Sequence, residues 1–192
     1  MFDRLTAVAA PLPIANVDTD MVIPARFMKA LSRTGLGRHL FQELRYTPDG
    51  GEREDFVLNR GATRGAQILI ADRNFGCGSS REHAVWALRD FGIRCVIAPS
   101  FGDIFSNNAR KTGLLLIRLP AAICDRLRDE VALAQFAPMT VDLADQRLTL
   151  ASGESIEFAI DPDDRRTLLD GRDDIARTLR HEAAIARFET AA

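Results

Sequence analysis

The middle of the chain reads Gln67-Ile-Leu-Ile-Ala-Asp-Arg-Asn-Phe-Gly-Cys-Gly-Ser-Ser-Arg-Glu-His83. Its first five residues form a short apolar run, which is typical of a strand buried on both faces of a sheet. A loop follows over 72–79, and from Ser80 the apolar residues recur with the spacing of a helix that ends at Gly92. This order of strand, loop and helix predicts a βα unit of a parallel sheet.

A second unit of the same kind follows directly. Residues 93–98 form another apolar run, 103–112 have helical spacing up to Gly113, and 114–119 form a third apolar run before Pro120. Three parallel strands joined by two crossover helices make a parallel α/β core. We therefore expect an α/β fold.

The segments after this core have other periodicities. Residues 121–134 have the apolar spacing of an amphipathic helix that lies on the core. Three short segments then alternate apolar and polar residues, as in an antiparallel strand meander. They are 140–144, 147–151 and 155–160. Two C-terminal helices are expected, over 161–170 and 173–190.

The N-terminal part of the chain carries weaker signals. We predict a strand at 5–10, a polar loop at 16–23 and a short helix after Pro24. The stretch 32–38 contains two glycines and two arginines with little hydrophobic periodicity. We therefore expect a mobile surface loop over about 28–38.

Length and composition fit one globular domain over residues 1–192. Of the 192 residues, 46% are hydrophobic and 27% are charged. The 25 Lys and Arg residues against 27 Asp and Glu residues leave a net charge of −2, so no basic field is available for nucleic acid. No run approaches the roughly 20 apolar residues that span a bilayer, and no signal peptide is recognised. We expect a cytoplasmic protein without membrane contact.

The cysteines argue against a bound cofactor. Cys77, Cys95 and Cys124 are an odd number and contain no C-x-x-C pair. This spacing disfavours disulfides and a self-contained metal or iron–sulfur site. Cys77 lies in the loop before a helix, where thiols can be activated, yet no neighbouring base identifies it as a nucleophile.

The loop before the first predicted helix has the features of an anion site. Ser79 and Glu82 have capping-box spacing, and two glycines allow backbone N–H groups to face one point. Ser79, Ser80 and Arg81 place two hydroxyls and a guanidinium at the positive end of the helix dipole, which suits a carboxylate or phosphate. The alternative is an ordinary helix cap without a ligand.

Other sites are less well supported. Arg81 stands where a dinucleotide fingerprint needs its third glycine, and no G-x-x-x-x-G-K motif is present. Asp18 and Asp20 are spaced like two ligands of a hard cation, or like an Asx turn followed by a helix cap. The rest of a calcium loop is missing. His83 and Trp86 are expected to pack rather than to catalyse.

Four motifs occur along the chain. They are Asn16-Val-Asp-Thr-Asp-Met-Val-Ile-Pro-Ala-Arg-Phe27, Arg33-Thr-Gly-Leu-Gly-Arg-His-Leu-Phe41, Asp55-Phe-Val-Leu-Asn59 and Asn74-Phe-Gly-Cys-Gly-Ser-Ser-Arg-Glu-His83. In order and spacing they resemble the small-subunit family of bacterial 3-isopropylmalate dehydratases. The resemblance implies a swivelling β/β/α domain of the aconitase type. It also implies a hydro-lyase subunit of leucine biosynthesis, inactive alone, whose large subunit carries a 4Fe-4S cluster.

The resemblance assigns roles to matching residues. Ser79 would be the base, as an alkoxide that exchanges a proton with the substrate carbon, while Ser80 and Arg81 would hold a carboxylate of a dicarboxylate substrate. Asp20 would lie at the active-site edge and support acid–base residues of the large subunit. The loop around Arg33 would recognise the variable side chain of the substrate.

Four positions depart from the family's pattern, and none belongs to the proposed site. They are Val85, Leu116, Arg172 and Ala176. These departures leave open a related hydro-lyase that acts on citramalate or a dimethylmalate. A second alternative is a non-catalytic module that has the swivelling fold and binds anions without a partner.

Overall fold

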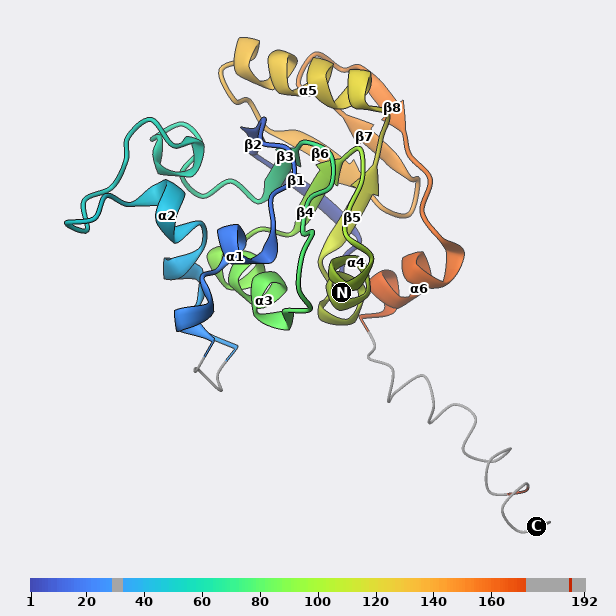
Figure 1. Cartoon of the computed structure of the whole chain (residues 1–192). Coiled ribbons are helices and arrows are strands. Elements are labelled where there is room, and N and C mark those ends of the chain that lie inside the picture. Colours follow the sequence, from blue (N-terminus) through green and yellow to red (C-terminus); the bar gives the residue numbers. More distant parts are fainter. Residues whose placement is uncertain (29–32, 172–186, 188–192) are drawn as a thin grey trace.

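The computed structural model describes residues 1–28, 33–171 and 187 (Figure 1). The strands of this part are β1 (Arg4–Ala7), β2 (Ala9–Leu12), β3 (Ile68–Ala71), β4 (Cys95–Ala98), β5 (Leu115–Arg118), β6 (Met139–Asp142), β7 (Arg147–Thr149) and β8 (Ser155–Glu157). The α-helices are α1 (Thr19–Val22), α2 (Gln42–Arg45), α3 (Glu82–Phe91), α4 (Asp103–Thr112), α5 (Ala121–Leu133) and α6 (Pro162–Asp170). Three 3-10 helices complete this set, namely η1 (Ala25–Phe27), η2 (Gly37–His39) and η3 (Val57–Asn59).

The parallel sheet has four strands in the order β2-β3-β4-β5. The predicted strands β3, β4 and β5 and the crossover helices α3 and α4 are confirmed, and α4 has the predicted bounds. The sheet also contains β2, which the sequence analysis did not predict as a separate strand. Pro11 lies inside β2 and is tolerated because β2 is an edge strand.

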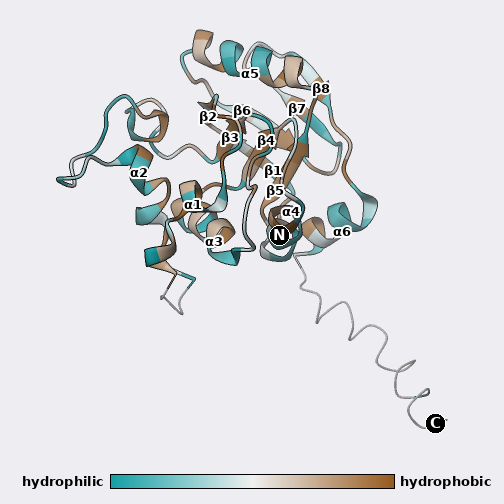
Figure 2. Ribbon diagram, viewed as in Figure 1, coloured by the Kyte–Doolittle hydropathy of each residue, from teal (hydrophilic) through white to brown (hydrophobic). Residues whose placement is uncertain are grey.

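The parallel sheet separates two hydrophobic cores. Leu69 faces α3 and α4 in one core, whereas Ile68 and Ile70 belong to the other core, together with α5 and the second sheet. Successive residues face opposite ways because side chains alternate along a strand. Figure 2 shows the hydrophobic strands between more hydrophilic helices. The layers are therefore β/β/α, as expected.

The second sheet is antiparallel, with the order β1-β6-β7-β8. The predicted meander is confirmed as β6, β7 and β8, each shorter than the predicted segment. Strand β1 pairs with β6, so that Arg4 lies opposite Asp142. The first strand of the chain thus joins the C-terminal meander in one sheet.

The prediction of a single strand at 5–10 is wrong, because the structure has two strands there. The segment divides at Val8, so that β1 joins the antiparallel sheet and β2 joins the parallel sheet. Both halves are apolar, and apolarity does not specify which sheet a strand joins. The division matters for the site because β2 leads directly into the segment 13–20.

Part of the predicted surface loop is buried. Leu36 is only 2% exposed. The backbone N–H of Gly37 donates to Oδ2 of Asp90 at 2.7 Å, and a Cβ on Gly37 would lie 2.5 Å from the backbone nitrogen of Phe91. This end of the loop is therefore packed on α3, contrary to the prediction, because Gly37 allows close backbone contact.

Two expectations lie wholly or partly outside the described residues. The predicted loop over 28–38 includes 29–32, and the second C-terminal helix was predicted over 173–190. The first C-terminal helix is confirmed as α6, where the Asp161 carboxylate accepts hydrogen bonds from the backbone nitrogens of the first turn. Among the described helices, none has the length and apolarity needed to cross a membrane.

Candidate active site

The residues 72–81, here called the site loop, connect β3 to α3 at the carboxyl end of the parallel sheet. Backbone hydrogen bonds hold this loop on both sides. Gly76 N donates to Val17 O at 2.7 Å, while Phe75 N donates to Ser100 O at 3.0 Å. The site loop therefore lies between the segments that follow β2 and β4, where open α/β sheets bind ligands.

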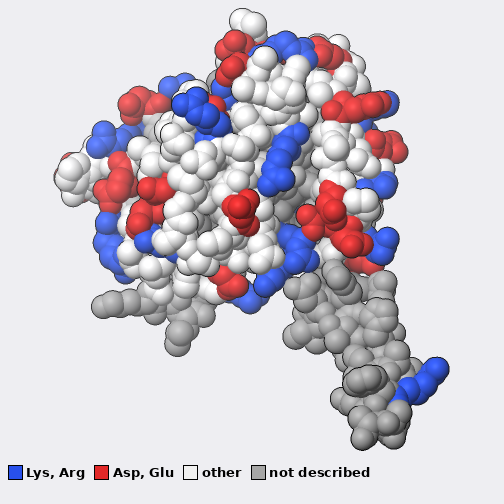
Figure 3. All heavy atoms as spheres, turned by 45° about the vertical axis from the view of Figure 1, so that its right-hand side comes forward, with Lys and Arg blue, Asp and Glu red and all other residues white. Residues whose placement is uncertain are grey.

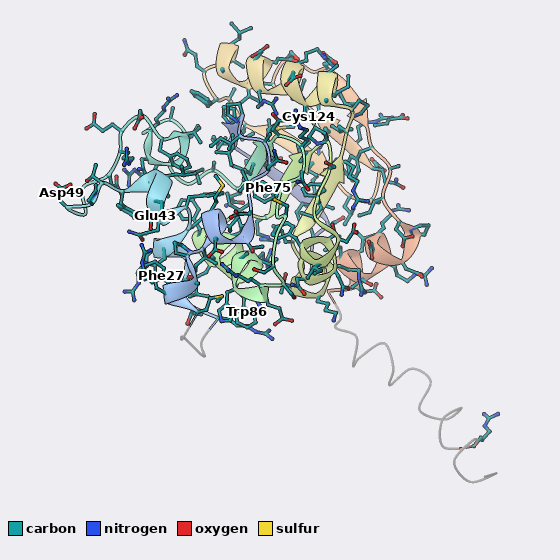
Figure 4. The ribbon with its side chains drawn as sticks, in the orientation of Figure 1. Phe27, Glu43, Asp49, Phe75, Trp86 and Cys124 are labelled. Atoms are coloured by element: carbon teal, nitrogen blue, oxygen red, sulfur yellow. The ribbon has the colours of Figure 1, made fainter. Side chains whose placement is uncertain are left out.

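Close backbone contact fixes the middle of the site loop. Gly76 has a φ of 74°, and a Cβ there would lie 2.3 Å from the Phe105 ring. On the other side, a Cβ on Gly102 would lie 2.5 Å from the carbonyl oxygen of Gly76. Phe75, labelled in Figure 4, packs edge-on against Phe105 with 5.5 Å between ring centroids. The glycines thus allow the loop to lie directly on α4.

Helix α3 begins later than predicted. Its first residue is Glu82, and Arg81 precedes it in an extended conformation with φ −138° and ψ 101°. The expected capping box between Ser79 and Glu82 is therefore wrong, because Ser79 lies outside the first turn and no side chain caps α3. The Ser79 hydroxyl is consequently not engaged in capping.

Arg81 is held by a carboxylate that comes from a distant part of the sequence. Its Nη2 donates to Oδ2 of Asp20 at 2.6 Å, and Nη1 pairs with Oδ1 of the same carboxylate. The Arg81 side chain is 13% exposed and that of Asp20 is 55% exposed. The hydrogen bond from Arg81 lowers the pKa of the Asp20 carboxyl, and Asp20 raises the pKa of the guanidinium. The pair is therefore charged at neutral pH.

The structure brings four of the five predicted site residues into one area. Ser79 and Ser80 are exposed next to Arg81 at the start of α3, and Asp20 reaches Arg81 from α1. Arg33 is the exception, since its guanidinium lies 5.1 Å from the centroid of the Trp86 ring, farther along α3. Two hydroxyls and a fixed guanidinium beside a helix N-terminus can bind a carboxylate.

Asp18 caps a helix rather than binding a cation. Its Oδ1 accepts a hydrogen bond from Met21 N at 2.7 Å and thereby starts α1. The residues described contain no group of three or more His, Cys, Asp or Glu side chains placed to hold a metal ion. Of the two alternatives, the structure thus favours the turn and helix cap.

His83 and Trp86 pack together, as predicted. Their ring centroids lie 4.7 Å apart on α3. In Figure 4 the Trp86 side chain lies beside α3, on the part of the molecule that also carries Phe27. In the part of the chain that the structure describes, no hydrogen bond links either side chain to Ser79 or Arg81.

Two kinds of site residue could not be predicted from the sequence. Thr19 is 3% exposed, and its Oγ1 donates to the Ser79 carbonyl at 3.1 Å. Asn16 and Asn74 both have a positive φ, and the Asn74 side chain donates to Asn16 Oδ1 at 2.9 Å. Neither has a local sequence signal, because each partner lies far away along the chain.

The cysteines present do not fit an iron–sulfur cluster. Cys95 and Cys124 are buried in the core, and burial raises the pKa of the Cys124 thiol to about 11. Burial also raises the pKa of Cys95 well above its ordinary value. Only Cys77 lies in the site loop. That this chain binds no cluster of its own stays a prediction.

Charges of both signs are interspersed on the face drawn in Figure 3. Exposed ion pairs of the described residues include Arg126 with Glu154 at 2.7 Å and Arg147 with Glu157 at 3.0 Å. This face presents no broad area of one sign.

Comparisons with known proteins agree with the fold. Residues 1–122 match a family model described as the aconitase C-terminal domain, and residues 125–162 match a model described as LeuD_N. A crystal structure of 3-isopropylmalate dehydratase from Methanocaldococcus jannaschii has the same fold, with a TM-score of 0.70, 24% identity and coverage of 96% of this chain and 98% of that chain. The fold and site loop thus define a swivelling domain of the aconitase superfamily.

Curated relatives identify the family within this superfamily. The chain is 61% identical to a 3-isopropylmalate dehydratase small subunit from Granulibacter bethesdensis, over 98% of this chain and 90% of the relative. It is 58% identical to one from Paramagnetospirillum magneticum, over 98% and 94%. The chain belongs to the family of 3-isopropylmalate dehydratase small subunits. It is therefore one subunit of a lyase, and the family name implies a large subunit.

Proposed function

We propose that this chain and its large subunit convert 2-isopropylmalate into 3-isopropylmalate by dehydration and rehydration, as a step of leucine biosynthesis in the cytoplasm. The observation that carries the proposal is the 61% identity to a named small subunit over 98% of the chain. The exposed hydroxyls and the guanidinium of the site loop are suited to a hydroxy dicarboxylate.

Arg81 is proposed to bind one carboxylate of the substrate. The Asp20 carboxylate accepts a hydrogen bond from Nη2 of Arg81 and forms an ion pair with Nη1. Because Nη1 is buried, this leaves Nε–H and the second hydrogen of Nη2 for another carboxylate. Asp20 therefore holds the plane of the guanidinium, and the substrate can bind side-on with help from the Ser80 hydroxyl. A role of Asp20 toward acid–base residues of the large subunit stays a prediction.

Ser79 is proposed to be the base that exchanges a proton with the substrate carbon. A serine alkoxide is strongly basic, so its charge needs stabilisation. The N-terminus of α3 and the Arg81 guanidinium supply positive potential beside it, and closure against the large subunit would exclude water. These groups would stabilise the negative charge of a Ser79 alkoxide at the N-terminus of α3.

The 4Fe-4S cluster is assigned to the large subunit. When bound there, it supplies the Lewis acid for loss of the substrate hydroxyl. The residues of this chain bind and orient the carboxylate and hold the proton at Ser79. The chain alone should therefore be colourless and inactive.

The segment around Arg33 is proposed to contact the branch of the substrate. Arg33 stacks on Trp86, which belongs to the helix that begins at the site loop. This contact with α3 is the observation that supports the proposal. The residues 29–32 of this segment lie outside the described part of the chain.

The test is reconstitution with the large subunit and an assay against 2-isopropylmalate, citramalate and a dimethylmalate. We expect the highest kcat/KM with 2-isopropylmalate and an ultraviolet-absorbing unsaturated intermediate. A clear preference for another malate would assign a related hydro-lyase. Failure to turn over any of them with an active partner would favour an anion-binding module.

A further inference from the structure

Thr19 forms two hydrogen bonds to the site loop from a buried position. Its backbone N–H donates to the Cys77 carbonyl at 3.0 Å, and its Oγ1 donates to the Ser79 carbonyl at 3.1 Å. The residue is 3% exposed. One residue thus holds the chain on both sides of Gly78, which turns with a φ of 91°.

The position of Thr19 is itself fixed. It is the first residue of α1, which Asp18 caps through the bond to Met21 N. The next residue, Asp20, holds the guanidinium of Arg81. Three consecutive residues therefore start a helix, hold the carbonyl of Ser79 and hold the side chain of Arg81.

We propose that Thr19 is a positioning residue, whose buried hydroxyl sets the backbone at Ser79 and thereby aims the Ser79 hydroxyl at the substrate carbon. This inference rests on the proposed function of Ser79 as the base. Thr19 itself does not touch the substrate, because its side chain is buried beneath the site loop.

The physical argument concerns the direction of the Ser79 side chain. The orientation of the peptide between Ser79 and Ser80 sets both the Cα–Cβ direction at Ser79 and the direction of the Ser80 N–H. Thr19 holds the carbonyl of this peptide. Loss of the bond leaves the carbonyl free to turn, and a displacement of about 1 Å at a reacting group can cost roughly 100-fold in rate.

The first experiment compares Thr19→Val and Thr19→Ser in the complex with the large subunit. Thr19→Val keeps the shape and removes the donor, so we expect kcat to fall about 10- to 100-fold, while KM changes less than about threefold. Thr19→Ser keeps the donor and should restore most of kcat. A Thr19→Val enzyme with unchanged kcat would overturn the inference.

Thr63→Val is the matched control. Thr63 is also fully buried, and its Oγ1 donates to the carbonyl of Val57, away from the site loop. Its replacement removes the same kind of bond, and we expect kcat to be unchanged. An equal fall in kcat for Thr63→Val and Thr19→Val would show a general loss of folded enzyme and would overturn the assignment.

A double variant separates this inference from the proposed function. If Thr19 acts through the Ser79 hydroxyl, Thr19→Val should cost little further rate in a Ser79→Ala background. The same loss in both backgrounds would overturn the positioning of Ser79 and leave its role as base intact. Full activity of Ser79→Ala alone would instead contradict the proposal that Ser79 is the base.

Thiol labelling of the isolated full chain supplies a readout besides activity. Cys77 accepts a hydrogen bond from Thr19 N at its carbonyl, whereas Cys95 and Cys124 are buried with raised thiol pKa values. A maleimide should therefore report on Cys77 alone. We expect Thr19→Val to raise the labelling rate several-fold and Thr19→Ser to restore it. An unchanged rate would show that Thr19 does not hold the loop, whatever Ser79 does.

Discussion

The two units β3–α3 and β4–α4 are alike in their helices and differ in their loops. Both helices have 10 residues, both lack a side-chain cap at the start, and both end at a left-handed glycine, Gly92 or Gly113. The loop before α3 spans 72–81, whereas the loop before α4 spans only 99–102. The longer loop exposes Ser79 and Ser80, and the shorter one packs against it where Gly102 meets Gly76.

The residue that precedes each helix shows the difference most clearly. Arg81 precedes α3 and carries a guanidinium held by Asp20. Gly102 precedes α4 and lies so close to Gly76 that a Cβ would be 2.5 Å from its carbonyl oxygen. Arg81 supplies a guanidinium to the site, whereas Gly102, which has no side chain, leaves room for the site loop. Two helices of the same length, with similar ends, therefore have different roles because the loops that lead into them differ.

Replacement of Ser79 should have the largest effect, because only the first loop presents the proposed base. We expect Ser79→Ala to lower kcat in the complex by about 10²- to 10⁴-fold with little change in KM. Ser106→Ala on α4 is the control and should leave kcat unchanged. If Ser79→Ala retains more than about a tenth of the wild-type rate, Ser79 is not the base.

Arg81→Lys tests whether the residue before α3 binds a carboxylate through a planar contact. Lys cannot reproduce this geometry, so we expect KM to rise by about 10- to 100-fold, with a smaller change in kcat. Arg126→Lys makes the same substitution in an ion pair with Glu154 on the surface and should leave KM unchanged. An unaltered KM for Arg81→Lys would place the carboxylate on the large subunit.

Gly102→Ala tests the contact between the two loops. Its φ of −63° suits alanine, so the penalty comes from the clash with the backbone of Gly76 and Cys77, and we expect about 1–3 kcal/mol lower stability in urea unfolding. Gly61→Ala meets nothing within 4 Å and should change stability by less than about 0.5 kcal/mol. Equal stability of both variants would mean that the loops are not in close contact.

Asp20→Asn should have the smallest effect, and its pH dependence has a definite sign. Arg81 lowers the pKa of Asp20, so the pair stabilises the folded chain above the ordinary value of 3.8 and loses this contribution as pH falls through the lowered pKa. Because the carboxylate is 55% exposed, we expect at most about 1 kcal/mol near neutral pH.

The measurement is the difference in unfolding free energy between wild type and Asp20→Asn as a function of pH. The difference should disappear in strong acid. Asp145→Asn, on an exposed turn of the antiparallel sheet, is the control and should show no such trend. A difference that grows as pH falls would reverse the sign and contradict the pairing with Arg81.

The parallel units could be predicted because their signals are local. Short apolar runs mark β3, β4 and β5, and a glycine follows each crossover helix. The separation of β1 from β2 could not be predicted, since strand partners are chosen by tertiary contacts and not by the residues of the strand. Ala7 and Ala9 are the same residue type in different sheets.

The site was predictable only in part for the same reason. Ser79, Ser80 and Arg81 are consecutive and precede a recognisable helix, so their proximity follows from the chain itself. The partners of this group, Thr19 and Asp20, lie 60 and 61 residues away from Ser79 and Arg81. No periodicity spans such a distance, and only the fold shows that α1 holds the site loop.

The pairing of β1 with β6 has a consequence for synthesis of the chain on the ribosome. Strand β1 emerges first, but its partner β6 begins only at Met139, after the entire parallel sheet has been made. Until then β1 is an unpaired strand attached through Val8 to a sheet that can already form. Translation products that end before β6 should therefore aggregate through this edge, even though their parallel sheet is complete.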